Sequence, residues 1–176
     1  MSERNLFARP LPPGYRDELQ ALVAERPADP PRRTGSLLLF QLGELRLALP
    51  TRVASAVAPV LHIARIPHRS GTVLLGLTAF RGDIVPCCSL ARILGVPQSP
   101  TGTARTLILE ESAGRRWAVP IDAVLGVRMA ATELAQNKDD IPLAAHWVQG
   151  SFNDDSGEFY MLDSDTLFRQ ITLATA

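Results

Sequence analysis

The sequence predicts an all-β domain made of short strands, arranged as small barrels or as a sandwich. Three observations support this fold class. Short apolar runs are separated by glycine and proline, the chain contains an internal repeat, and 46% of the 176 residues are hydrophobic. That hydrophobic share is typical of globular proteins, and the length is that of one domain or of two very small ones.

The first 35 residues differ from the rest of the chain. They hold six of the 14 prolines, a density that excludes a sheet there. One short helix is expected at about 15–26, because apolar side chains recur on one helical face and prolines flank the segment. We therefore divide the chain into an N-terminal extension, 1–35, and a domain, 36–172. Within the extension, 1–14 and 27–35 are expected to be mobile.

Strands are expected from Ser36 onward. The apolar run Leu37–Leu42, the turn Gly43-Glu44 and the alternating segment Leu45–Leu49 predict a hairpin. Two short helices are expected near Ser89–Leu94 and Ser164–Arg169. Further short strands are expected at Leu74–Phe80, Ile84–Cys88, Thr106–Glu111, Trp117–Val119 and Phe159–Leu162.

The chain repeats itself at a spacing of 70 to 75 residues. Five matches in order are too many for chance and predict two copies of one small all-β unit. We expect the copies to pack face to face, so that the groove between them is the natural binding surface. The matches are Ala48-Leu49-Pro50 with Ala118-Val119-Pro120, Val57 with Val127, Ile66-Pro67 with Ile141-Pro142, Gly76 with Gly150, and Leu90 with Leu162.

Composition excludes several classes of function. The 18 basic and 18 acidic residues balance, which argues against nucleic-acid binding. The longest uncharged apolar stretch, Thr72–Phe80, is too short to cross a membrane, so no membrane insertion is expected. No phosphate-binding glycine loop, zinc spacing or nucleophile motif is present, so we expect no cofactor, no metal and no enzymatic activity.

Three groups of polar residues have a structural and a chemical interpretation. Asp163 and Asp165 could begin a metal site, but a helix N-cap beside Ser164 is favoured. Cys87 and Cys88 could form a redox pair, but neighbouring strand residues point to opposite faces, and buried, unpaired cysteines are favoured. His68 is favoured as a turn residue, since the sequence shows no nucleophile to accompany it.

The segment from Gly76 to Gly95, GLTAFRGDIVPCCSLARILG, resembles the signature of CheW-like domains. The similarity extends over about Ser36 to Gln170, and a shorter stretch at 9–19 is similar to the lead of Wsp-type variants of the family. The matching signature residues are Gly76, Arg81, Gly82, Ile84, Val85, Pro86, Leu90, Leu94 and Gly95.

The resemblance implies two small five-stranded barrels packed together, with no active site. It also implies a non-enzymatic adaptor that couples the cytoplasmic tips of chemoreceptors to a CheA-like histidine kinase, in the cytoplasm at membrane-associated receptor arrays. The alternative is a redox- or ligand-responsive sensor on the same fold, with Cys87 and Cys88 as the responsive element.

The resemblance also implies two sets of site residues. Receptor binding is expected at Phe80, Arg81 and Gly82, beside the groove between the barrels. The simpler alternative is a hairpin turn in which Gly82 supplies a positive φ and Arg81 is solvated. The family's Asn-Leu is replaced here by Ala79-Phe80.

Kinase binding is expected at Val53, Ser55, Ala56 and Val57, a mostly apolar stretch after the first hairpin. Ala56 stands where the family often has an acidic residue. For Val53 and Val57, burial in the core is an equal alternative. Ala56 therefore discriminates between the two interpretations: a change of Ala56 to Arg is expected to leave the fold intact and to abolish kinase association.

Overall fold

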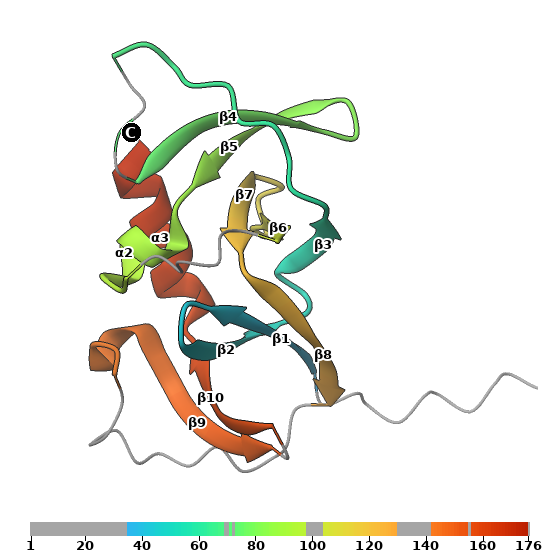
Figure 1. Ribbon diagram of the computed structural model, residues 1–176, viewed down its shortest axis with the longest axis vertical. Coiled ribbons are helices and arrows are strands. Elements are labelled where there is room, and N and C mark those ends of the chain that lie inside the picture. Colours follow the sequence, from blue (N-terminus) through green and yellow to red (C-terminus); the bar gives the residue numbers. More distant parts are fainter. Residues whose placement is uncertain are drawn as a thin grey trace, which may run out of the picture. The chain divides into compact units, whose positions relative to one another are not determined.

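Two five-stranded sheets make up most of the computed structural model (Figure 1), which describes residues 35–68, 71, 73–97, 104–129, 142–154 and 156–175. Sheet A has the order β8-β1-β2-β10-β9: β8 is Ala123–Met129, β1 Ser36–Leu42, β2 Leu45–Pro50, β10 Gly157–Leu162 and β9 Val148–Asp154. Sheet B has the order β3-β6-β7-β5-β4: β3 is Ala54–Ala58, β6 Arg105–Glu110, β7 Arg116–Ile121, β5 Asp83–Cys88 and β4 Leu74–Phe80. The helices are α2, Leu90–Leu94, the short 3-10 helix η2, Ala145–Trp147, and α3, Ser164–Thr175.

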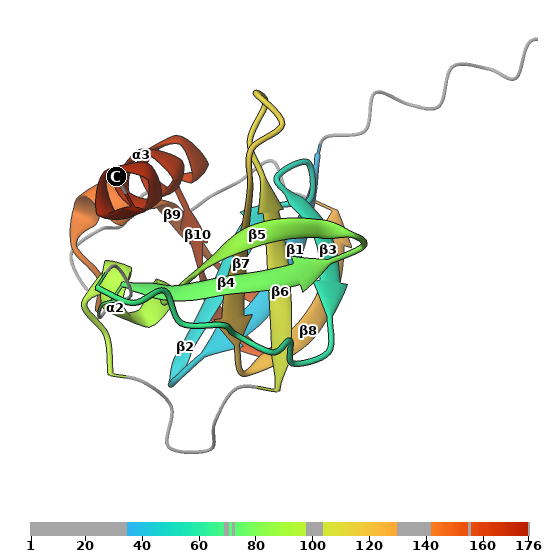
Figure 2. The same cartoon turned by 90° about the horizontal axis from the view of Figure 1, so that it is seen from above.

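The predicted fold class is confirmed: the described chain is mostly β, in two five-stranded units with few short helices. Both sheets curl, and their strand orders remain open, with β8 and β9 at the edges of one and β3 and β4 at the edges of the other. Figure 2 shows α2 and α3 gathered on one side of the two sheets. The expected helix at 15–26 and the segments 1–14 and 27–34 lie outside the described residues.

Every strand predicted from alternation is present, with ends that differ by two residues or fewer. In the first hairpin Leu42 faces Leu45 across the turn, and Gly43 has the positive φ of +62° that this tight turn needs. The helix expected at Ser164–Arg169 continues to Thr175, because Leu167, Phe168 and Ile171 bury one face of it.

Both of the described α-helices begin at a capping side chain, and the sequence predicted the one that precedes α3. The Ser89 hydroxyl accepts a hydrogen bond from the Arg92 amide at 3.4 Å, and Gly95 ends α2 with a φ of +72°. Asp163 Oδ1 accepts a hydrogen bond from the Thr166 amide at 2.7 Å, which confirms the capping interpretation of this carboxylate. Within the described residues no group of three or more His, Cys, Asp or Glu could hold a metal ion.

The two sequence copies exchange strands instead of forming one sheet each. The first copy, β1–β5 with α2, matches the second, β6–β10 with α3, element by element. However, β1 and β2 belong to sheet A, whereas β3, β4 and β5 belong to sheet B, and the second copy is divided in the opposite way. The expectation of two copies that pack as separate units is therefore corrected: each sheet contains strands from both.

The strand registers fix which residues of the copies are equivalent. Gly76 pairs with Cys87 and Gly150 with Met161, each at a β-bulge, so this predicted match holds. Cys88 and Leu162 each occupy the next rung of their ladders. Leu162 is therefore equivalent to Cys88, and the match proposed between Leu162 and Leu90 is wrong by two positions.

Three hydrophobic clusters hold this arrangement together within the compact unit of residues 34–176. The largest joins the facing sides of both sheets to α2 and α3, and it includes Phe40, Leu49 and Leu109. A smaller cluster lies inside the curl of each sheet, around Phe159 in sheet A and around Ile108 in sheet B. Burying large apolar side chains on both faces of each sheet supplies most of the driving force for folding.

Position 76 requires a glycine for two reasons: its backbone conformation and the lack of space for a side chain. Its φ is +150°, and a Cβ there would overlap the carbonyl oxygen of Ala64, whose amide and carbonyl both pair with Leu77. Because the Ala64 carbonyl belongs to the main chain and is paired with Leu77, it cannot move aside to make room for a Cβ. We expect Gly76→Ala to lower the free energy of unfolding by about 2 kcal/mol or more, measured by chemical denaturation.

Gly126 provides the matched control for this prediction. Its φ of +145° is almost the same, but nothing lies within 4 Å of the Cβ position. Gly126→Ala therefore introduces the backbone strain without the overlap. It should lower the free energy of unfolding clearly less than Gly76→Ala does. Equal losses in the two variants would show that the contact with Ala64 is unimportant.

Candidate functional site

Arg81 and Gly82 form the two-residue turn of the β4–β5 hairpin. Phe80 and Asp83 pair across it, and the φ values of Arg81 and Gly82 are +51° and +89°. Positive φ at both central positions matches the twist of the strands, but at a non-glycine residue it costs on the order of 1 kcal/mol. The turn predicted as the simpler alternative is therefore present, and an exposed arginine occupies its strained position.

The Arg81 side chain is presented on an aromatic ring. Its guanidinium carbon lies 5.1 Å from the centroid of the Phe80 ring, a cation–π contact that limits where the side chain points. Figure 1 shows the tip of the β4–β5 hairpin projecting to the right from sheet B, which lies above sheet A in this view. The expectation that Arg81 lies beside the groove between the two units stays a prediction.

Ile84, next to the turn, is an exposed apolar residue that sequence reasoning placed only in a strand. It is 74% exposed and lines a shallow, mainly apolar pocket of about 350 Å³ with His62, Ala64, Leu77, Thr78 and Ala79. The signal in the sequence was its position as the second residue after the turn, at the exposed start of β5. The hairpin therefore offers a cation on an aromatic ring, and an aliphatic side chain on its other face, because Phe80 pairs with Asp83 and Ile84 pairs with Ala79.

The four residues expected to bind a kinase separate into three environments. Val53 is only 8% exposed and belongs to the main core. Ser55 and Val57 point outward from β3, an edge strand whose one partner in the sheet is β6. Ala56 is half-buried against the cluster around Ile108. The core alternative thus holds for Val53 but not for Val57, which is 43% exposed.

The position of Ala56 corrects the mutational test expected from the sequence. An arginine there would place a charge against Val85, Cys87 and Ile108, so it would disturb the sheet whether or not a partner docks. A β-bulge between Ala54 and Ala56 shifts the alternation along this strand, which is why the sequence pattern did not reveal the orientation. Val57 is the informative position on this surface.

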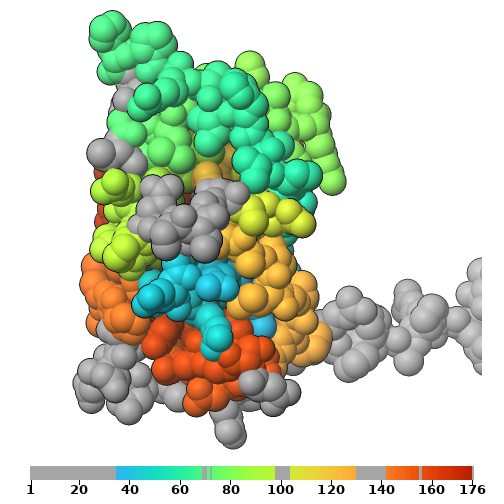
Figure 3. Space-filling view, viewed as in Figure 1, coloured from blue at the N-terminus to red at the C-terminus, as the bar shows by residue number. Residues whose placement is uncertain are grey.

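Strand β8 carries an exposed apolar row that the sequence analysis missed. Leu125, Val127 and Met129 are 42%, 65% and 54% exposed and alternate along the free edge strand of sheet A. Val127 is equivalent to Val57 in the repeat, and Figures 1 and 2 show β3 and β8 on the same flank, where both reach the surface in Figure 3. The alternation at 125, 127 and 129 was the available signal, but Gly126 interrupts it.

A network of charged side chains surrounds the β6–β7 turn. Arg116 donates to Glu110 and to Asp83, with both distances 2.9 Å. Hydrogen bonds from Arg116 and then Ser55 hold the pKa of Glu110 below its usual value, although desolvation opposes them. The neighbouring Arg115 pairs with Glu111 at 2.7 Å and lies over the ring of Trp117.

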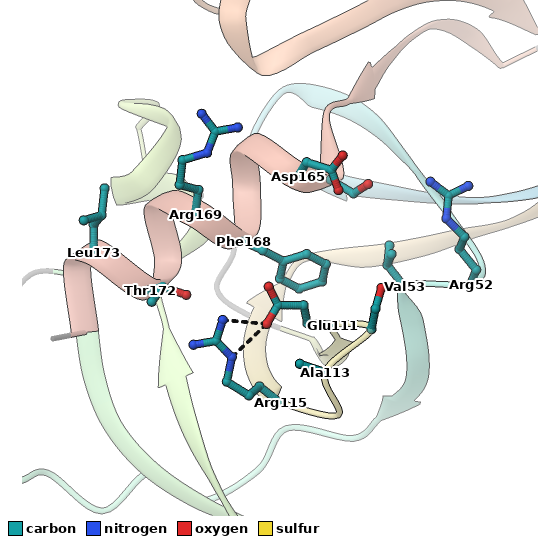
Figure 4. Close-up of a pocket in the computed structure, with 12 residues that line it drawn as sticks. Arg52, Val53, Glu111, Ala113, Arg115, Asp165, Phe168, Arg169, Thr172 and Leu173 are labelled. Carbon is teal, nitrogen blue, oxygen red and sulfur yellow. Dashed lines mark hydrogen bonds and ion pairs between the residues drawn. The ribbon is translucent and has the colours of Figure 1, made fainter.

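A groove of about 630 Å³ opens between α3 and the same turn (Figure 4). Phe168 and Val53 provide apolar surface in it, and the charged side chains around it have both signs. Arg115 points across it and is already paired with Glu111, as the dashed lines show. This mixture of charges gives no specific ligand chemistry. The residues that line it are Arg52, Val53, Glu111, Ser112, Ala113, Arg115, Ser164, Asp165, Phe168, Arg169, Thr172 and Leu173.

Cys87 and Cys88 are free thiols buried in different clusters. Cys87 lies inside the curl of sheet B, and Cys88 lies in the core between the sheets, as expected for neighbours on a strand. Burial raises the pKa of Cys87 from 9.0 to about 11. Burial, and then the nearby Cys87, raise the pKa of Cys88 to about 12. Because the thiolate is the reactive form, these features argue against a redox-responsive role.

Comparison with known proteins adds three findings. The family model described as CheW-like domain matches residues 36–172. Protein FrzA of Myxococcus xanthus is 28% identical over 89 residues, which cover 51% of this chain and 55% of FrzA, so the chain spans about half the length of that relative. The crystal structure of the scaffolding protein TtCheW from Thermoanaerobacter tengcongensis matches with a TM-score of 0.64 at 20% identity, over 74% of this chain and 85% of that chain, which supports the fold.

Within the described residues, no helix is long and apolar enough to cross a membrane.

The buried thiols generate a prediction about reactivity and pH. We expect neither Cys87 nor Cys88 to react with a thiol reagent in the native protein at pH 8, and both to react after denaturation. In the unfolded chain the thiols ionise near pH 9.0, whereas in the folded chain they stay neutral until about 11 and about 12. Their contribution to stability is therefore complete below pH 9 and is lost as the pH rises through 11 and 12.

The measurement is the melting temperature between pH 8 and 11, together with the labelling rate. A folded variant with both cysteines changed to alanine should lack the thiol-dependent part of the loss at high pH. Rapid labelling of either thiol in the native protein would contradict the burial described above and would restore the redox alternative.

Proposed function

Because this chain belongs to the CheW-like domain family, we propose that it is a non-enzymatic adaptor that couples the cytoplasmic tips of chemoreceptors to a CheA-type histidine kinase. A scaffold needs surfaces that hold other proteins, and the fold offers them at its edges. Most of the exposed large apolar side chains of the described residues lie on or just after the edge strands β3 and β8. This concentration is the observation that carries the proposal.

The proposed receptor site is the β4–β5 hairpin with Phe80, Arg81 and Gly82. Arginine and aromatic residues are the types most enriched at the energetic centres of interfaces. Arg81 is exposed and is held on the Phe80 ring, and the exposed Ile84 lies on the other face of the hairpin, so a partner that wraps around the tip would reach both. A receptor tip with carboxylate or carbonyl groups would satisfy the guanidinium, while its apolar side chains would cover Ile84.

The proposed kinase site is the outward face of β3, with Val57 and Ser55. A free strand edge presents unpaired backbone groups, and here the exposed side chains beside it are small or apolar and uncharged. Charge is depleted at the centres of protein interfaces, and this part of β3 has none. Val53 supports the strand from the core and does not itself contact the partner.

This function places the chain in the cytoplasm at membrane-associated receptor arrays, where receptor tips and kinase meet. It requires no cofactor, because the proposed contacts are between proteins only. The similarity to Wsp-type variants, at residues 9–19, lies outside the described residues. An assignment to an alternative chemosensory pathway therefore stays a prediction.

Substitution of Arg81 tests the receptor site. We expect Arg81→Ala to weaken binding of a receptor signalling-domain fragment by more than tenfold, as loss of an interface arginine does. The melting temperature should stay nearly constant, because an exposed turn side chain contributes little to stability. Arg105→Ala is the control, since Arg105 is an exposed arginine at the start of β6 that contacts only a neighbouring carbonyl among the described contacts. Unchanged affinity in a folded Arg81→Ala protein would refute the receptor assignment.

Substitution of Val57 tests the kinase site. We expect Val57→Arg to abolish co-purification of the CheA-like kinase, because the docked partner would bury an unpaired charge. The fold should persist, since this side chain is 43% exposed. Val127→Arg makes the same change at the equivalent position of β8 and should retain the kinase. The reverse result, loss with Val127→Arg and retention with Val57→Arg, would move the docking site to β8.

A further inference from the structure

Four polar side chains form a row across four neighbouring strands of sheet B. They are Ser55 on β3, Glu110 on β6, Arg116 on β7 and Asp83 on β5. Arg116 connects the row: its Nε donates to Glu110 and its Nη1 to Asp83, each at 2.9 Å. Ser55 lies beside the Glu110 carboxylate and, after Arg116, helps to hold the pKa of that carboxyl below its usual value. The row therefore begins on the proposed kinase strand and ends at the residue that follows the Arg81-Gly82 turn.

The row crosses sheet B at two places where the backbone ladder is interrupted. Strands β5 and β7 are paired at Cys87 and Ala118, beyond Asp83 and Arg116 in the direction of both strands. Before that rung the strands separate, and a groove of about 500 Å³ opens between 83–86 and 114–117. The ion pair of Arg116 with Asp83 spans this groove, so it ties the base of the β4–β5 hairpin to β7.

The second interruption lies on the other side of the row. Ser55 occupies the bulge between Ala54 and Ala56, where the register of β3 against β6 shifts. Ser55 thereby places the bulge next to the last rung of the β6–β7 hairpin, in which Glu110 and Arg116 face each other. Side chains thus make the connection at the two places where main-chain pairing is weakest.

We propose that Arg116 is a positioning residue that holds the Arg81 hairpin and strand β3 in one fixed geometry, so that the two docking sites are presented together. This inference rests on the proposed function. A guanidinium suits the task because its planar fork donates to two carboxylates in different directions at once. The ammonium of a lysine is a compact charge and cannot reproduce that fork.

The position of Arg116 predicts a pattern of partner affinities. Arg116→Gln weakens binding of both the receptor fragment and the kinase regulatory domain by about threefold, a size appropriate to partly exposed ion pairs. Asp83→Ala weakens only receptor binding, and Ser55→Ala weakens only kinase binding, because each removes one end of the row. Arg116→Lys does not restore both affinities. A general loss of stability would weaken the binding of both partners in every variant. Melting temperatures measured on every variant would reveal such a loss.

Arg115→Gln is the matched control. Arg115 is the adjacent arginine and has its own surface ion pair with Glu111, but it lies outside the row. Arg115→Gln should leave the affinities for the receptor fragment and for the kinase regulatory domain unchanged. The proposal is overturned if Arg116→Gln behaves like Arg115→Gln while Arg81→Ala and Val57→Arg still lose their partners, or if Arg116→Lys binds both partners as the unchanged chain does. If Arg81→Ala and Val57→Arg also bind normally, the proposed docking sites themselves are wrong.

Discussion

The parallel pairings of β2 with β10 and of β5 with β7 are the contacts on which the rest of this structure depends. Met161 lies beside Ala48 in one and Cys87 beside Ala118 in the other, at equivalent positions of the two copies. Each pairing joins a hairpin from one copy to a hairpin from the other. Without them each sheet separates into two parts, and the main core, which lies between the facing sides of both sheets, is no longer enclosed. The docking surfaces are the outer edges of these joined sheets.

Alternation and turn chemistry were sufficient to predict the hairpins, the cap of α3 and the fold class, because these depend on neighbours in sequence. Strands β3, β8 and β9 were not predicted. Small residues fill β3, Gly126 interrupts β8, and Gly150 and the polar end of β9 weaken its apolar pattern. The exchange of strands could not be predicted either, since a repeat shows which residues are equivalent but not which strands pair.

The candidate site was predictable to a similar degree. The Arg81-Gly82 turn follows from local chemistry, and burial of Val53 was recognised as an alternative. The inward orientation of Ala56 depends on a bulge, and the connection from Asp83 to Ser55 depends on strand order. Both are tertiary properties. The two copies also show where the outward positions of β3 and β8 are kept and where they differ: Val57 and Val127 are the same residue, whereas Ser55 is matched by Leu125.

The exchange of strands has a consequence for the order in which the molecule forms on the ribosome. The β1–β2 hairpin emerges first, but its sheet partners β8, β9 and β10 are the last strands to be made. Sheet B has all its strands once β7 is complete. The first hairpin must therefore wait with its apolar residues uncovered while the rest of the chain is translated. During that interval it is the segment of the nascent chain most exposed to chaperones and to wrong pairing.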